Sequence, residues 1–214
     1  MPTCSEPSPD ELTPLPAAAA SLTAADQRDT PGPLYRRLLG PSWLQLSEPV
    51  RVAHATESTV RASGRLRIVH GRSYFARLLA RLLHLPRASD AADTQLVVTP
   101  GADGERWSRT FDDRRLDTRQ YQAGDCDLAE RIGVLELRFR LEASEGSLLF
   151  RQLDAALLCG SVRLRLPAMW APRVDAREDP AGARRIRVHV RVTLPGLGPV
   201  LAYDGPIDIE EPST

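Results

Sequence analysis

From residue 56 onward the chain alternates apolar and polar residues in short runs, the pattern of β-strands with one covered and one solvated face. The two clearest runs span 134–143 and 184–194. A shift of one residue in register would invert such a face, so the pattern predicts which side of each strand meets the core. The predicted core positions of these runs are Leu135, Leu137, Phe139, Leu141, Ile186, Val188, Val190, Val192 and Leu194.

Similar runs recur between turn signals along the rest of the chain. They span 58–71, 94–124, 134–158, 161–167, 173–179, 184–194 and 200–210, and a turn at 144–147 divides the third into a hairpin. Roughly ten strands at this spacing are typical of an antiparallel sheet, sandwich or barrel. We therefore predict a mainly β (α+β) domain, built on a large curved antiparallel sheet or a β-barrel-like sheet.

Helical spacing replaces this pattern at the N-terminal side of the domain and in one insertion. A helix is predicted at 33–39 and a short second one at 42–46. The insertion 71–87, GRSYFARLLARLLHLPR, predicts an amphipathic helix over 73–85 that covers the sheet. Its broad apolar arc comprises Tyr74, Phe75, Leu78, Leu79, Leu82, Leu83 and Leu85.

The ends of the chain differ from this patterned region in composition. Residues 1–32 are rich in proline and alanine and nearly lack large apolar residues, so we predict a disordered tail there. Residues 33–210 are predicted to form a single domain, and 211–214 a short C-terminal tail.

Charge and cysteine content narrow the classes of function. The formal net charge is zero and every cation is arginine, so no global field attracts nucleic acid and none is expected as a partner. The three cysteines show no CxxC pairing, which argues against a disulfide framework or a metal site, and no cofactor is expected. No apolar run is long enough for a transmembrane helix, and the acidic, proline-containing N-terminus does not resemble a signal peptide. The expected location is therefore cytoplasmic.

The polar strand faces are rich in arginine, and three interpretations remain open. In the first they form a solvated outer face whose arginines pair with Glu136, Glu142, Asp175 and Glu178. In the second they line a concavity that binds an anionic ligand. In the third the apolar faces enclose an interior that holds a small ligand.

The chain carries few signs of catalysis. No nucleophile elbow, dinucleotide fingerprint or phosphate-binding loop occurs, and the four histidines lack the spacing of metal ligands. The candidate ligand-binding residues are His70, Trp107, Glu136, Trp170 and Arg173. If the sheet instead hides an acid–base pair, its members would be His70, Glu136, Asp175 and Glu178.

Two further residues carry structural expectations. Trp170 stands between Pro167 and Pro172, which predicts a rigid crossover whose tryptophan plugs one end of the sheet; a ligand gate is the alternative. Cys159 follows an apolar strand and is expected to be a buried thiol.

The order of several segments suggests a family. LYRRLLGPSWLQL, SGRLRIVHG, ARLLARLLHLP, GERWSRTF, RFRLEASEGSLLF and WAPRVDARED occur in that order, followed by a closing hairpin. Together they resemble the bacterial DUF4166 family, a domain of unknown function, over about Gly32 to Glu210. The resemblance implies no catalytic residues. Some members carry the domain at the end of larger proteins, which implies an accessory or sensing role.

Three functions follow from these observations. The first is a non-catalytic binding or accessory domain that holds an apolar or amphipathic small molecule, or an anionic one, in a barrel-like sheet. The second is an interaction or dimerisation module that uses the 73–85 helix or a sheet edge. The third is an enzyme with an acid–base pair inside the sheet.

Overall fold

A computed structural model describes residues 32–74, 77–78, 81 and 85–210. Three short helices come first: α1 (Leu34–Leu39), the 3₁₀-helix η1 (Gly40–Gln45) and α2 (Glu48–His54). Proline suits the first turn of both η1 and α2, because its missing N–H would have no partner there in any case. Among the described residues, no helix is long and apolar enough to cross a membrane.

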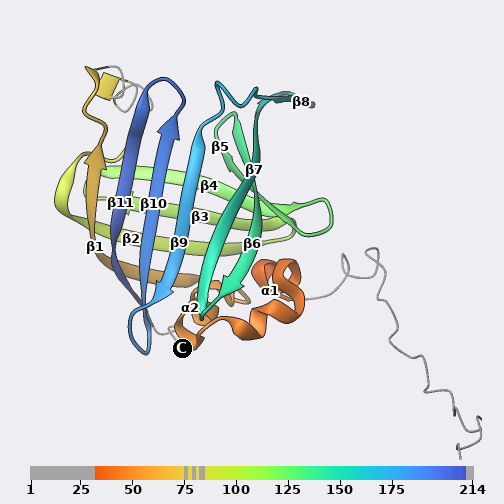
Figure 1. Cartoon of the computed structure of the whole chain (residues 1–214). Helices are drawn as coiled ribbons and strands as arrows, with labels where there is room; N and C mark the ends of the chain where they lie inside the picture. Colours follow the sequence, from red (N-terminus) through yellow and green to blue (C-terminus); the bar gives the residue numbers. More distant parts are fainter. Residues whose placement is uncertain (1–31, 75–76, 79–80, 82–84, 211–214) are drawn as a thin grey trace, which may run out of the picture.

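Eleven strands follow in the part of the chain that the structure describes (Figure 1). They are β1 (Val60–His70), β2 (Ser89–Gly101), β3 (Gly104–Phe111), β4 (Arg114–Ala123), β5 (Asp127–Ile132), β6 (Leu135–Ser144), β7 (Ser147–Cys159), β8 (Val162–Arg165), β9 (Arg173–Pro180), β10 (Arg185–Leu194) and β11 (Gly198–Ile209). The strand β2 begins at Ser89, five residues before the predicted run 94–124, and β5 lies outside the predicted runs, between 94–124 and 134–158.

The strands form one antiparallel sheet in the order β6-β5-β4-β3-β2-β1-β11-β10-β9-β7-β8, and the additional pairing of β6 with β7 closes ten of them into a barrel. Every pair in the ring joins sequence neighbours except β1–β11 and β7–β9. The β8 strand pairs with β7 alone and stands outside the ring. The prediction of a barrel-like antiparallel sheet is therefore confirmed.

The predicted hairpin turn at 144–147 is also confirmed. The two loop residues, Glu145 and Gly146, have φ values of 51° and 82°, the left-handed conformations of a type I′ turn, whose twist matches that of the flanking strands. The backbone N–H of Ser47 donates to the carbonyl of Gly146 at 2.9 Å, so this turn anchors the segment between η1 and α2.

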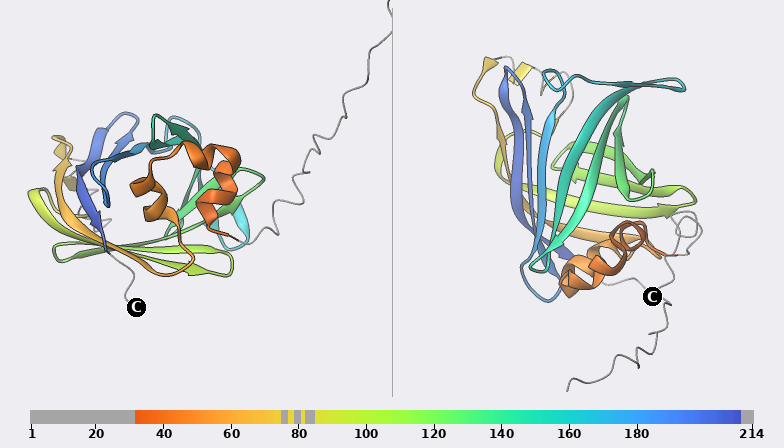
Figure 2. Two further views of the ribbon diagram at one scale, coloured as in Figure 1. Left: turned by 90° about the horizontal axis from the view of Figure 1, so that it is seen from below. Right: turned by 45° about the vertical axis from the view of Figure 1, so that its right-hand side comes forward.

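The three helices cover the lower end of the barrel (Figures 1 and 2). The α1 helix contacts β4 and β6, and α2 contacts β9, β10 and β11. Their inward side chains Tyr35, Val50 and His54 are fully buried and continue the core of the barrel. One end of the barrel is therefore closed by a helical floor.

The barrel interior receives the apolar faces predicted for β6 and β10, since Leu137, Phe139, Leu141 and Ile186 are buried. In the run 161–167, alternation sets Val162, Leu164 and Leu166 on one face and predicts that this face meets the core. That prediction is wrong for Val162 and Leu164, which are 61% and 58% exposed. The β8 strand lies outside the ring and has no interior to face.

Three other expectations about burial fail. Tyr74 and Leu78 are 68% and 40% exposed, so these two members of the predicted 73–85 arc do not pack into the core, whereas Leu85 is partly buried against it. Residues 75–76, 79–80 and 82–84 lie outside the described residues. Trp170 is 69% exposed and plugs nothing, because its turn projects beyond the upper rim of the barrel. Cys159 is exposed at the end of β7, where only the short β8 lies beside it.

Candidate functional site

The interior of the barrel contains a group of charged and polar side chains. Directly paired residues of neighbouring antiparallel strands point to the same side. Buried Trp107 therefore fixes the inner face of β3, and Glu105 and Arg109 share it by alternation. Their partners on β4 bring Gln120 and Thr118 to the same surface.

An ion pair stands at the centre of this group. Arg109 Nη1 lies 3.1 Å from Glu130 Oε1, and it also donates to Thr118 Oγ1 at 3.0 Å. The Thr118 hydroxyl donates to the same Glu130 oxygen at 2.8 Å, and the guanidinium stacks 4.9 Å from the ring centre of Trp107. Burial alone would lower the pKa of Arg109, but the Glu130 carboxylate, together with Tyr203 and Tyr35, outweighs burial and raises it.

A second set of contacts joins the floor to the barrel wall. His54 of α2 lies 2.6 Å from Glu178 of β9, measured from Nε2 to Oε2. The Tyr35 ring of α1 stacks 3.9 Å from the His54 ring, and its hydroxyl donates to Gln120 Oε1 at 2.6 Å. Burial, followed by the charges of Glu105, Glu178 and Glu130, raises the pKa of Tyr35 well above its ordinary value. These contacts fix the helices against the strands.

Glu105 has no cationic partner within the described residues. Its two oxygens accept hydrogen bonds from the Thr56 hydroxyl and, at 3.0 Å, from Trp107 Nε1. The residue is only 3% exposed. Two donors thus satisfy a carboxylate that water does not reach.

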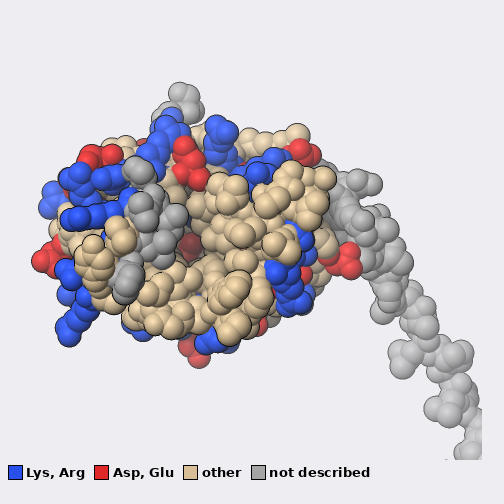
Figure 3. All heavy atoms as spheres, turned by 90° about the horizontal axis from the view of Figure 1, so that it is seen from above, with Lys and Arg blue, Asp and Glu red and all other residues tan. Residues whose placement is uncertain are grey.

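The barrel is hollow above this floor. The side chains of Arg109 and Glu130 are each 15% exposed, although strands surround them on all sides. Along β10, Ile186 next to the floor is buried, whereas Val188, Val190 and Val192 above it are only partly buried. The space-filling view from above shows a hollow at this end, with acidic side-chain atoms in its depth (Figure 3).

Tyr203 lines the same interior from β11, directly opposite Val190 of β10. Its ring packs 5.5 Å from that of Phe111, and its hydroxyl donates no hydrogen bond to a described residue. Burial raises the pKa of Tyr203, the charge of Arg109 opposes this, and Glu130 and Glu178 add to it. Tyr203 therefore lies within electrostatic reach of Arg109, Glu130 and Glu178.

The five predicted ligand-binding residues do not come together. Trp107 alone lies in the polar interior, where it contacts Glu105 and Arg109. His70 stands at the upper end of β1 and donates from Nε2 to the Pro86 carbonyl at 2.6 Å. Arg173 and Trp170 are exposed near the start of β9.

Glu136, the remaining member, is buried on the outer side of the wall. Its carboxylate accepts from Tyr121, from Arg163 at 2.6 Å and from Arg138 at 3.2 Å. Of the four residues named for an acid–base pair, Glu178 alone meets another titratable side chain inside the barrel, and that partner is His54. Among the described residues, no group of three or more His, Cys, Asp or Glu side chains is arranged to hold a metal ion.

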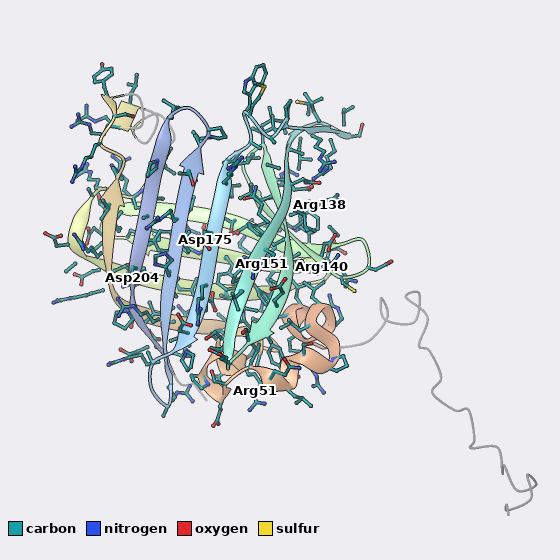
Figure 4. All side chains as sticks on the ribbon, viewed as in Figure 1. Arg51, Arg138, Arg140, Arg151, Asp175 and Asp204 are labelled. Atoms are coloured by element: carbon teal, nitrogen blue, oxygen red, sulfur yellow. The ribbon has the colours of Figure 1, made fainter. Side chains whose placement is uncertain are left out.

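The outer strand faces agree with the first interpretation, a solvated surface on which arginines pair with carboxylates. Arginines there pair with carboxylates on neighbouring strands, as Arg185 does with Asp208 at 2.6 Å and Arg151 with Glu142 at 3.0 Å. Figure 4 shows Arg151, Asp175 and Asp204 on the outside of the barrel. Two of the four expected partners are exceptions: Glu178 faces inward, and Asp175 forms no ion pair within the described residues.

Comparison with known proteins adds a family and no function. No curated protein and no solved structure matches the chain. Residues 46–207 match DUF4166, described as a domain of unknown function, and this range includes most of the barrel and all of α2. The chain therefore belongs to the DUF4166 family.

Proposed function

We propose that the barrel is a binding domain for a small amphipathic molecule, which enters the hollow from the end opposite the helices. The observation that carries this proposal is the exposure of Arg109 and Glu130, since water reaches these two side chains inside a closed ring of strands. Ligand sites of this kind combine apolar walls with a few fixed polar groups.

The apolar part of the ligand would lie against the partly buried interior side chains. Those on the described strands include Leu96, Leu116, Val174, Val188 and Val192. The polar part would reach the Arg109–Glu130 pair and the Tyr203 hydroxyl. Because the pair is held by Thr118 and Trp107, these groups are already oriented before a ligand arrives.

The experiment is a fluorescence titration with Nile red, together with native mass spectrometry of the purified protein and its solvent extract. In Val190→Trp the indole occupies the hollow, so we expect binding to weaken by about tenfold or more. Val69 lies on β1 and is 46% exposed, so Val69→Trp is the matched control and should bind as the wild type does.

The proposal fails if the wild type neither binds Nile red nor copurifies with a small molecule. It fails equally if Val190→Trp and Val69→Trp bind Nile red with the same affinity, since the probe would then sit outside the barrel.

A further inference from the structure

Three arginines stand side by side on the outer face of the barrel. In the strand register, Arg106 of β3 is directly opposite Arg119 of β4, and Arg119 is directly opposite Arg131 of β5. Like charges at directly opposed positions destabilise a sheet, because their side chains are neighbours. The sequence therefore maintains an unfavourable row across three adjacent strands.

The row has few carboxylates to offset it. Arg119 reaches Asp103 at 3.4 Å, but these side chains are 56% and 83% exposed. The Nε of Arg131 donates to the carbonyl of Gly133 at 2.9 Å. Arg106 forms no ion pair within the described part of the chain.

Glu136 lies opposite Arg131 on β6, yet its carboxylate is already bound by Tyr121, Arg138 and Arg163. Arg140 and Arg151 are also directly opposite one another, but each contacts a carboxylate of its own, Asp127 and Glu142. Arg185 likewise meets both oxygens of Asp208, at 2.6 and 2.9 Å.

The row borders a groove of about 530 Å³ between the outer wall and α1. Arg119 and Arg131 line it together with Tyr121, and α1 contributes Arg37 from the other side. The Nε of Arg37 is buried without a hydrogen-bond partner, while its Nη1 donates to the Gly32 carbonyl at 2.7 Å. Three guanidiniums and one carboxylate, Asp103, thus line the groove.

We propose that this groove binds a multiply charged oxyanion, the phosphate or diphosphate group of a small molecule. Adjacent strands are about 4.8 Å apart, so Arg119 and Arg131 present neighbouring planar forks to the oxygens of such a group. Bound phosphate would neutralise the opposed charges. The site is on the outside of the wall and does not depend on the proposed ligand of the interior.

The test is calorimetric titration with pyrophosphate at low ionic strength, using the full chain. The wild type should bind, and Arg119→Gln and Arg131→Gln should each weaken binding by about tenfold or more. Arg185→Gln removes an arginine that is already paired with Asp208, so its affinity should stay within about twofold of the wild type.

Thermal unfolding without ligand gives an independent readout. Arg119→Gln removes a charge that faces two others and loses only the exposed 3.4 Å contact with Asp103. This variant should therefore melt no lower than Arg185→Gln, which loses both hydrogen bonds to Asp208. The proposal is overturned if pyrophosphate does not bind the wild type, or if Arg185→Gln loses as much affinity as the two groove variants. Val190→Trp, which fills the interior, should bind pyrophosphate normally; a loss of binding there would also contradict the assignment to the groove.

Discussion

Arg109 and Glu130 illustrate what a charged pair requires inside a barrel. Each side chain is largely buried, with 15% of it exposed, and each charge depends on the other, while Thr118 and Trp107 complete the contacts of the guanidinium. Removing one member leaves the other without its partner, which costs far more than removing both.

We therefore expect Arg109→Met to lower the free energy of unfolding by about 2–4 kcal/mol, because Glu130 is left in the interior without its cationic partner. The double variant Arg109→Met/Glu130→Gln should recover at least half of this loss, since no charge is then left unpaired. Urea unfolding of the wild type, Arg109→Met, Glu130→Gln and the double variant measures the coupling energy between the two side chains. Additive losses would show that the two side chains do not act as a pair.

The Glu136 carboxyl should make the free energy of unfolding depend on pH in the acidic range. Burial opposes its ionisation, but hydrogen bonds from Arg163, Tyr121 and Arg138 prevail and lower its pKa. A carboxyl whose pKa is lower in the folded state stabilises that state above its unfolded pKa, and this contribution is lost as the pH falls through the folded value. At pH 7 Glu136→Gln should therefore be about 1–3 kcal/mol less stable than the wild type.

Below about pH 4.5, the ordinary pKa of a glutamic acid, the difference between Glu136→Gln and the wild type should narrow. Urea unfolding of both proteins, at a series of pH values from 7 down to the lowest pH at which they fold, measures this difference. A constant difference across the series would mean that the Glu136 carboxyl does not titrate with folding.

The interior charges are visible in the sequence as charged residues on the apolar side of two strands. In GERWSRTF, Glu105 and Arg109 fall on the same alternate positions as Trp107 and Phe111, and in DLAERI, Glu130 falls between Leu128 and Ile132. Charges on the apolar side of a strand indicate an interior that is polar or open. Tyr35 and His54 gave no comparable signal, because their role depends on where the helices pack.

Among the elements, β7 is unusual because it changes partner along its length. Its residues 156–159 pair with β8, whereas 148–150 pair with β9. Between these stretches the side chain of Gln152 replaces the missing backbone ladder: its Nε2 donates to the Pro172 carbonyl at 2.7 Å, and its Oε1 accepts from the Val174 N–H at 2.6 Å.

Gln152→Leu should lower the free energy of unfolding by about 1–3 kcal/mol, because the Val174 N–H and the Pro172 carbonyl both lose their partner. Hydrogen exchange should accelerate at the Val174 amide in particular. Gln95→Leu, at an exposed position of β2, is the matched control and should change stability by less than about 0.5 kcal/mol. Unchanged protection of Val174 in Gln152→Leu would contradict the bridging role.

Strand positions and their faces follow from local alternation, so most were predictable for β6 and β10. The partner of a strand is not a local property. The run 161–167 alternates as regularly as a core strand, but β8 lies outside the ring. There Arg163 pairs with Glu136 and Asp154, while the apolar side chains of β8 face solvent. Alternation alone could not separate these two cases.

At the scale of the whole molecule, closure depends on two long-range pairings, β1–β11 and β7–β9, which no local pattern reveals. Closure by strands and helices leaves a molecule that is filled at one end and hollow at the other. Val98 of β2 is fully buried on the inner face, opposite Trp107, whereas Val190 of β10 faces the hollow beside Tyr203.

The same substitution at these two valines therefore tests whether the upper half of the barrel is empty. Val98→Phe must displace packed neighbours and should lower the free energy of unfolding by about 1–3 kcal/mol. Val190→Phe adds a ring where there is room and should change it by less than about 1 kcal/mol, since the added apolar area offsets any local adjustment. Urea unfolding of both variants gives the comparison. Equal losses would show that the interior is packed throughout, and the proposed binding function would lose its physical basis.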